Sequence, residues 1–146
     1  MGGTMKIHIV TIGSPKLEYA KSGWDLYIER LKHYHSVRVT HISDKQNDAT
    51  HITAAAGSAY TVALVINGPQ MSSEALATFI EKRANVAQEL CFLVGGPDGL
   101  PHDVIAAADK QWGLSELTFP HDLAMVVLAE TLYRASTITA GQPYHH

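Results

Sequence analysis

The regular alternation of short apolar runs with longer segments of helical periodicity limits this chain to few folds. Runs rich in apolar and β-branched residues, typical of strands, occupy 6–12, 36–42, 61–66, 90–94 and 114–119. Those at 61–66 and 90–94 are apolar almost throughout, as expected of strands that are covered on both faces. Strands that alternate with helices at this spacing predict an α/β fold with a parallel-type sheet and helices on both of its faces.

Each segment between the predicted strands carries helix start or stop signals. In 16–34, apolar residues recur at spacings of three and four, among them Ala20, Trp24, Ile28 and Leu31, which indicates an amphipathic helix. Short polar side chains occur where N-caps are expected, and a proline occurs where the first residue of a helix is expected. The further predicted helices run from Asn47 or Asp48 to about Gly57, from Ser72 or Ser73 to about Val86, from Pro101 to about Asp109, and over 121–139.

The composition limits the compartment and the partners of the chain. Its 146 residues include 11 Lys+Arg and 14 Asp+Glu, so the formal net charge is −3 and the basic excess of a freestanding nucleic-acid-binding protein is missing. A single cysteine, Cys91, excludes a disulfide scaffold and favours a cytoplasmic protein, and no apolar run is long enough to span a membrane. We expect one domain over 5–146, with 1–4 as an N-terminal extension.

Glycine-rich turns follow two of the predicted buried strands. The sequence GGPDG at 95–99 comes directly after the strand at 90–94, and Asn67-Gly68-Pro69 follows the strand at 61–66. Neither turn matches the dinucleotide fingerprint or the triphosphate-binding loop. Glycine lets the backbone approach a ligand closely, and open α/β sheets bind ligands beyond the carboxyl ends of their strands. These segments are therefore either tight turns or the walls of a binding site.

Nine histidines raise the question of a metal site, but none of them has the paired spacing of metal ligands. We therefore expect no metal, and we interpret His33, His35, His41 and His51 as solvated or capping side chains. His121 differs from these, because it follows a proline and begins the last predicted helix. At that position it can face the same cleft as the glycine-rich turn at 95–99.

The last predicted helix is apolar nearly all round, which exceeds what contact with one sheet face requires. This composition favours a second buried contact, most simply with another subunit. Glu130 and Arg134 lie four residues apart on the helix and are therefore spaced to form an ion pair.

Four ordered motifs in the last third of the chain resemble one bacterial enzyme family. They are LVGGPDGL at 93–100, LTFPH at 117–121, AETLYRA at 129–135 and PYH at 143–145. With them the chain looks like the bacterial large-subunit rRNA pseudouridine N3-methyltransferases, small members of the SPOUT methyltransferases. The resemblance implies S-adenosylmethionine as the methyl donor, a C-terminal trefoil knot and a homodimer. It also implies methylation of N3 of a pseudouridine in helix 69 of the 23S rRNA, in assembled ribosomes.

The resemblance assigns residues to the site as well. It implies a donor pocket made by three backbone loops, and the matching positions here are Leu64, Gly95, Gly96, Leu114, Ser115, Glu116, Leu117, Thr118 and Phe119. N3 of pseudouridine must lose its proton, and histidine is a general base suited to neutral pH. His121 and His145 are the two candidate bases. Tyr144 is expected to position the RNA base by stacking or hydrogen bonding.

Two other functions fit the same features of the sequence. One is the same fold and donor acting on another RNA such as a tRNA, although relatives of that kind commonly carry an extra RNA-binding domain. The other is a non-catalytic α/β ligand-binding module. The chain also has Met125 and His146 where several relatives in the family have arginine, which implies fewer phosphate contacts with RNA.

Overall fold

The computed structural model describes residues 4–86 and 88–146, so residues 1–3 of the predicted N-terminal extension lie outside the described part. The strands are β1 Lys6–Ile12, β2 Ser36–Ile42, β3 Tyr60–Leu64, β4 Leu90–Val94 and β5 Lys110–Trp112. The helices are α1 Glu18–Leu31, α2 Ala49–Ala56, α3 Ser73–Ala84, α4 His102–Ala107 and α5 His121–Ala140, with a 3-10 turn at Asp44–Gln46. Within the described residues, no helix is both long enough and apolar enough to cross a membrane.

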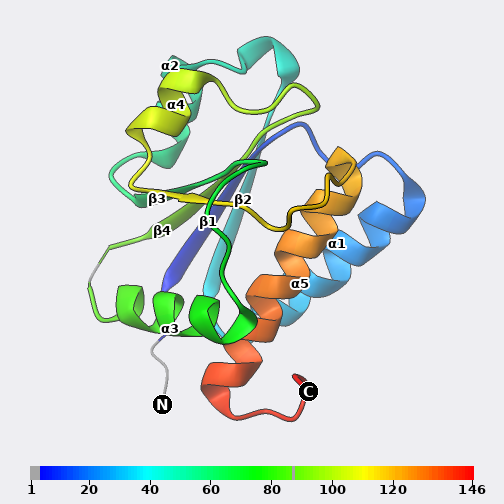
Figure 1. Cartoon of the computed structure of the whole chain (residues 1–146), viewed down its shortest axis with the longest axis vertical. Coiled ribbons are helices and arrows are strands. Elements are labelled where there is room, and N and C mark those ends of the chain that lie inside the picture. Colours follow the sequence, from blue (N-terminus) through cyan, green and yellow to red (C-terminus); the bar gives the residue numbers. More distant parts are fainter. Residues whose placement is uncertain (1–3, 87) are drawn as a thin grey trace.

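The five strands form one sheet in the order β2-β1-β4-β3-β5 (Figure 1), and every pairing between them is parallel. β1 and β4 lie at its centre, where Ile9 is in register with Phe92 and Val10 with Leu93. The predicted α/β fold with a parallel sheet is therefore confirmed. Because all strands run the same way, their carboxyl ends and the loops that follow them gather at one edge.

Helices cover both faces of the sheet, as predicted. On one face α1, α3 and α5 pack against Ile7, Ile9 and Phe92, which are fully buried. On the other face the shorter helices α2 and α4 pack against Val10 and Leu93. Since successive side chains of a strand point to opposite faces, each central strand contributes to both cores.

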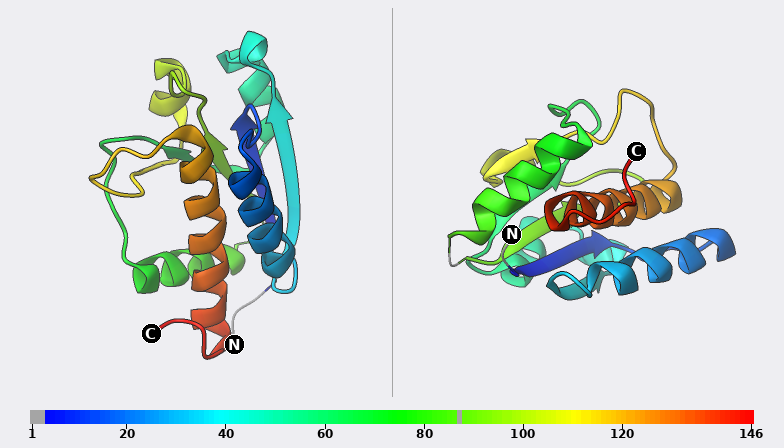
Figure 2. Two further views of the ribbon diagram at one scale, coloured as in Figure 1. Left: turned by 90° about the vertical axis from the view of Figure 1, so that its right-hand side faces the viewer. Right: turned by 90° about the horizontal axis from the view of Figure 1, so that it is seen from below.

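The apolar composition of α5 is explained mostly within the chain. α5 lies between α1 and α3 (Figure 2) and contacts both of them. Its residues Met125, Leu128 and Leu132 are 0% exposed. The helix therefore buries its apolar surface against the sheet and two neighbouring helices. Its composition alone does not require another subunit.

The predicted strand at 114–119 is wrong. The fifth strand is β5, a short edge strand that pairs with Val62–Leu64 of β3. The backbone leaves the sheet after Trp112, because the N–H of Gly113 donates to the carbonyl of Pro69 (3.0 Å) rather than to β3. Residues 113–120 are an irregular connection from β5 to α5.

Two predicted N-caps are confirmed. The Asp48 side chain accepts a hydrogen bond from the N–H of His51 at the start of α2, and Ser72 accepts one from Ala75 at the start of α3. The helices α1, α3 and α4 end two or three residues before the predicted points. β1, β2 and β4 have the predicted bounds, whereas β3 begins one residue and ends two residues before the predicted 61–66. Strand bounds follow burial, which the sequence shows directly, but helix ends fray and are less sharply specified.

The four histidines interpreted as solvated or capping differ from one another in the structure. His33 is exposed, and His51 pairs with the N-cap residue Asp48. His35 is buried, and its Nδ1 accepts a hydrogen bond from the N–H of Met5 (3.3 Å), so the solvated interpretation is wrong for His35. This bond joins the beginning of β1 to the beginning of β2.

Acid is expected to destabilise the fold through two buried histidines. Burial lowers the pKa of both His8 and His35 below the ordinary value of 6.5. The unfolded chain therefore binds more protons than the folded chain as the pH falls below about 6.5, and the free energy of unfolding decreases between pH 7 and pH 5, by at most about 1.4 kcal/mol per pH unit for each histidine. Urea unfolding at a series of pH values measures this slope.

The control for this slope is His35→Asn, whose side-chain oxygen can still accept the hydrogen bond from Met5 but cannot titrate. The variant should show a shallower decrease than the wild type over the same pH range. An equal slope in both proteins would show that His35 does not contribute.

Candidate functional site

Three loops meet beyond the carboxyl ends of β3, β4 and β5 and enclose a cavity of about 200 Å³. They are the segments 65–69, 95–99 and 113–120, and the first and second contain the two glycine-rich turns noted in the sequence. The lining residues are Leu64, Val65, Ile66, Val94, Gly95, Gly96, Pro97, Gly99, Leu114, Ser115, Leu117, Thr118, Phe119, His121 and Ala124. Of the two glycine-rich turns, the one at 95–99 lines the cavity, whereas Asn67, Gly68 and Pro69 are not among the lining residues.

Close backbone packing shapes this cavity. A Cβ atom on Gly95 would lie 2.5 Å from the carbonyl carbon of Gly99, and one on Gly113 would lie 2.5 Å from the carbonyl oxygen of Gly68. Real Cβ atoms essentially never come so near to backbone atoms, so both positions need glycine. The turn is closed by the N–H of Gly99, which donates to the carbonyl of Gly96 (2.9 Å).

Most residues that the resemblance assigned to the donor pocket line this cavity. They are Leu64, Gly95, Gly96, Leu114, Ser115, Leu117, Thr118 and Phe119. Glu116 is not among the lining residues and is exposed. The side chain of Ser115 accepts a hydrogen bond from the N–H of Leu117 (3.0 Å), which fixes the turn of this loop. At the mouth, Ile66 and Leu117 are 68% and 72% exposed.

Of the described residues that line the cavity, His121 alone carries a titratable side chain. It is the first residue of α5, and its Nδ1 lies 3.7 Å from the Asp122 carboxylate. Its Nε2 is buried without a hydrogen-bond partner among the described residues. Because an unpaired buried polar atom is costly, this nitrogen marks a position where a bound molecule can accept or donate a hydrogen bond.

Asp122, which follows His121, fixes the start of α1. Its carboxylate accepts hydrogen bonds from the N–H groups of Lys16 (2.9 Å) and Leu17 (2.6 Å). The bond from Leu17, together with that from Lys16 and the nearby His121, lowers the pKa of Asp122, although partial burial opposes this effect. The N-cap residue of α1 is Leu17, which has no side-chain oxygen to cap the helix. The Asp122 carboxylate binds instead the N–H groups of Leu17 and of Lys16 before it, and so fixes the chain where it enters α1.

Replacing Asp122 by alanine is expected to lower the free energy of unfolding by about 1.5–3 kcal/mol, because two N–H groups lose a charged acceptor. Asp122→Asn keeps one acceptor oxygen and should lose less. Urea unfolding of the three proteins measures the difference. Equal stability of the alanine variant and the wild type would contradict this account of Asp122.

His41, which the sequence placed among the solvated or capping histidines, also lies at the carboxyl edge. It is exposed overall, as the solvated interpretation predicts. Its Nδ1 contacts the Thr11 hydroxyl, which in turn contacts the carbonyl of Gly13. The single hydroxyl proton of Thr11 goes to that carbonyl, so in this arrangement His41 donates from Nδ1 and its Nε2 is free to accept. Burial lowers the pKa of His41, and the nearby His121 adds to the effect. The register of β1 with β2 pairs Thr11 with His41, and this pairing is the signal that locates His41 at the carboxyl edge.

Tyr144 and His145 lie far from His121 on the same chain. The Tyr144 hydroxyl donates to Glu130 (2.8 Å), and Arg134 donates to Nδ1 of His145 (3.1 Å), so the tail is held beside α5 at positions nine and thirteen residues after His121. α5 has 20 residues and is therefore about 30 Å long. The five residues from Gly141 to His145 can span only about 17 Å. One chain therefore does not bring the three predicted catalytic residues together.

The predicted ion pair on α5 is present. Nη2 of Arg134 lies 2.8 Å from a carboxylate oxygen of Glu130, and the guanidinium also lies over the ring of Tyr144, 4.8 Å from its centroid. Burial and the hydrogen bond to Glu130 raise the pKa of Tyr144, so its hydroxyl stays protonated at neutral pH. The pair thus holds the C-terminal segment 141–146 against α5.

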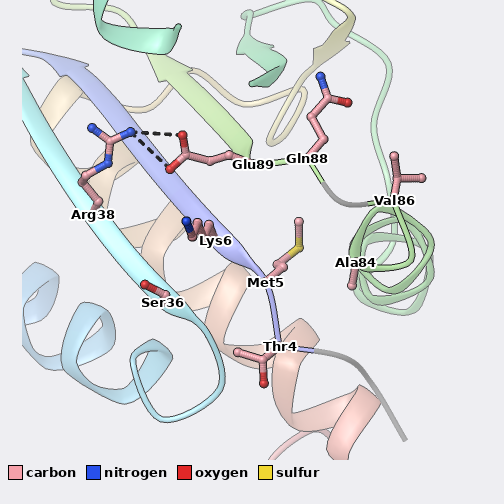
Figure 3. A pocket seen from close by; sticks show the side chains of 9 residues that line it. All are labelled: Thr4, Met5, Lys6, Ser36, Arg38, Ala84, Val86, Gln88 and Glu89. Carbon is pink, nitrogen blue, oxygen red and sulfur yellow. Dashed lines mark hydrogen bonds and ion pairs between the residues drawn. The ribbon is translucent and has the colours of Figure 1, made fainter. Parts of the chain in front are cut away.

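A larger hollow, of about 750 Å³, lies at the opposite edge of the sheet (Figure 3). Its charged side chains include Arg38 and Glu89, which are bonded to each other through Nη2 of the arginine at 3.0 and 3.2 Å. Open α/β sheets bind their ligands at the carboxyl ends of the strands, and this hollow is at the amino ends. We therefore assign the site to the smaller cavity. Among the described residues, no group of three or more His, Cys, Asp or Glu is placed to hold a metal ion.

Comparison with known proteins identifies the family of this chain. A family model described as "Predicted SPOUT methyltransferase" matches residues 5–145. A protein from Deinococcus radiodurans named "Ribosomal RNA large subunit methyltransferase H" is 48% identical, over 97% of this chain and 99% of that protein. A protein of the same name from Sorangium cellulosum is 37% identical, over 97% of this chain and 100% of that protein.

Solved structures agree on the fold. A structure of a probable methyltransferase from Bordetella pertussis Tohama I superimposes with a TM-score of 0.59, at 12% identity, and covers 91% of this chain and 95% of that one. This similarity bears on the fold alone. Together with the family model and the two relatives, it leads to one identification: the chain belongs to the SPOUT methyltransferase family.

Proposed function

We propose that the chain is an S-adenosylmethionine-dependent methyltransferase that methylates N3 of a pseudouridine in helix 69 of the 23S rRNA, in assembled ribosomes. The observation that carries the proposal is the cavity between the three loops at the carboxyl edge, in a chain of the SPOUT family. The names of the relatives from Deinococcus radiodurans and Sorangium cellulosum support rRNA as the substrate.

The cavity suits the proposed methyl donor. Leu64, Leu114 and Leu117 offer apolar walls for an adenine ring, and the close turn at Gly95 brings backbone N–H and carbonyl groups to the ligand. Of the described lining residues none is lysine or arginine, so a sulfonium cation meets no like charge there. When bound, S-adenosylmethionine supplies an electrophilic methyl group. Its transfer needs an attacking nitrogen in line with the carbon–sulfur bond, so the main task of the protein is orientation.

The proton of pseudouridine N3 needs an acceptor, and two histidines are proposed for this step. His121 has a buried and unpartnered Nε2 at the cavity wall. His145 is the alternative, provided that it reaches a cavity. In either case a neutral imidazole takes the proton from N3 before or during attack. Tyr144, which stays protonated, is proposed to hold the pyrimidine base by stacking and by donating a hydrogen bond.

A second copy of the chain is proposed to bring the tail to the cavity. The tail cannot span the length of α5 to reach the cavity of its own chain, whereas two copies related by a two-fold axis can place each tail beside the other cavity. Large apolar side chains are available for such an interface: Leu17, Tyr19 and Leu26 on and before α1, and Ile66 and Leu117 at the mouth, are all 46–72% exposed. We therefore propose a homodimer.

The trefoil knot is proposed because the resemblance to the family implies it, and a crossing of two connections agrees with it. The segment that follows β3 passes in front of the segment that follows β5 in Figure 1. The two are joined by hydrogen bonds from Val65 N–H to the carbonyl of Trp112 (2.9 Å) and from Gly113 N–H to the carbonyl of Pro69 (3.0 Å). A knotted path would fix this crossing, because neither connection could slide past the other.

The proposed function is tested by methyl transfer from labelled S-adenosylmethionine to three substrates: ribosomes that lack this methyl group, free 23S rRNA and tRNA. We expect label in ribosomes only, and none when uridine replaces the pseudouridine in helix 69. Labelled tRNA would favour the alternative RNA substrate. Donor binding without transfer to any substrate would favour a non-catalytic ligand-binding module.

A further inference from the structure

Both ring nitrogens of His145 are engaged in the structure. Arg134 contacts Nδ1 at 3.1 Å, and a carboxylate oxygen of Glu74 lies 3.2 Å from Nε2. Glu74 belongs to the first turn of α3, 71 positions before His145. The C-terminal segment returns beside the end of α5 toward α3 (Figure 2), so three separate parts of the chain meet at this imidazole.

The chemistry of these partners fixes the protonation of His145 in this arrangement. A guanidinium can only donate hydrogen bonds, so Nδ1 must accept and carries no proton. In the neutral ring the proton is therefore on Nε2, where it is donated to Glu74. The lone pair that could take a proton from a substrate is already occupied by Arg134. An imidazole held in this way cannot act as a general base.

We propose that Glu74 is a positioning residue that holds the C-terminal tail in a resting arrangement, from which His145 must be released to reach a substrate. The inference rests on the proposed role of His145 in methyl transfer. Loss of Glu74 leaves the bond from Arg134 to Nδ1 as the remaining hydrogen bond to the ring among the described residues, so the tail can be released by breaking one bond instead of two. Arg134 is less suitable for substitution, because it is also bonded to Glu130 and supports Tyr144. Glu74 thereby controls the fraction of time in which the tail is released and His145 can reach a substrate.

The charges around the tail allow such release. The groups that face His145 are Glu74 from α3, and Arg134 with its partner Glu130 from α5. The hydrogen bond from its own backbone N–H, and after it the bond to His145, lower the pKa of Glu74, so this carboxylate is ionised at neutral pH. The side chain of Glu74 is 67% exposed, and exposed ion pairs are weak, so docked and released tails can exchange.

The test compares wild type with Glu74→Lys, which places a positive charge beside Arg134, and with Glu74→Gln, which removes the charge but keeps the shape. Glu81→Lys is the matched control, because Glu81 lies on the same helix and, within the described residues, has no hydrogen bond to the tail. NMR relaxation of the Tyr144 and His145 amides reports tail order. Steady-state methyl transfer to ribosomes gives kcat and the KM for the donor over a range of pH.

We expect the order parameter of the His145 amide to fall from about 0.85 to below about 0.6 in Glu74→Lys, whereas that of Tyr144, which Glu130 still holds, should fall less. We also expect kcat to rise roughly two- to five-fold, with an unchanged donor KM, a smaller rise in Glu74→Gln and none in Glu81→Lys. An ordered tail in Glu74→Lys would overturn the proposal, and so would a loosened tail with a lower or unchanged kcat. If the wild type itself transfers no methyl group, the proposed function fails, and the tail order alone then decides whether Glu74 holds the tail.

Discussion

Replacing Gly95 by alanine is expected to raise the Kd for S-adenosylmethionine at least tenfold. The added Cβ would lie 2.5 Å from the carbonyl carbon of Gly99 and 2.6 Å from the nitrogen of Leu100, both of them backbone atoms that cannot rotate away. The turn must therefore open, and with it the wall of the cavity. Forced backbone shifts of this kind also cost about 1–3 kcal/mol of stability. Calorimetric titration with S-adenosylmethionine and urea unfolding measure the two effects.

Gly57→Ala is the control for the loss of donor affinity. Gly57 has φ +60°, so alanine is strained there, but a Cβ would meet nothing within 4 Å and the position is the C-cap of α2. This variant should lose stability and keep its affinity for the donor. Gly96→Ala should have a donor affinity between those of Gly57→Ala and Gly95→Ala, because its Cβ would meet only side chains, at 3.2 and 3.3 Å. Unchanged affinity in Gly95→Ala would refute the assignment of the cavity to the donor.

A mixed dimer of two inactive variants is expected to recover methyl transfer. His145→Ala should lose at least 100-fold in kcat if His145 is the general base, while it keeps donor binding. Gly95→Ala should lose donor binding while it keeps its tail. A dimer with one chain of each kind has one intact cavity facing one intact tail, so it should show roughly half of the wild-type rate per dimer.

Coexpression of the two variants with different affinity tags allows the mixed dimer to be isolated. The matched control is the mixed dimer in which one chain carries both substitutions and the other carries none. If the tail acts across the dimer, no intact cavity then faces an intact tail. That dimer should be inactive. Activity in the doubly substituted combination and none in the complementary one would show that cavity and tail act within one chain.

The sheet was predictable because its buried strands appear in the sequence as runs of apolar residues. Runs such as 90–94 lie in the centre of the sheet with every residue buried, so composition and structure agree. β5 was mislocated for a physical reason. It is an edge strand of three residues, and only Trp112 in it is buried, whereas the apolar segment after it lines the cavity instead of a sheet.

The position of the site was also predictable, because parallel strands bring their following loops together. The contacts that support the site were not predictable from the sequence. Asp122 bonds to Leu17, 105 positions away, and Glu74 bonds to His145, 71 positions away. Such pairs depend on how α1, α3 and α5 pack, which no local spacing records. Glu116 was assigned as part of the segment 114–119 that the resemblance matched to the donor pocket, but unlike its neighbours Ser115 and Leu117 it does not line the cavity.

Calorimetric titration of the purified protein with S-adenosylmethionine tests the central claim most directly. We predict micromolar binding at one site per chain, or one per dimer if the two cavities are coupled, with a negative heat-capacity change from the burial of apolar surface by Leu64, Leu114 and Leu117. Binding of this kind would establish the three-loop cavity as the donor site. The absence of binding heat at several temperatures in folded protein would contradict the account.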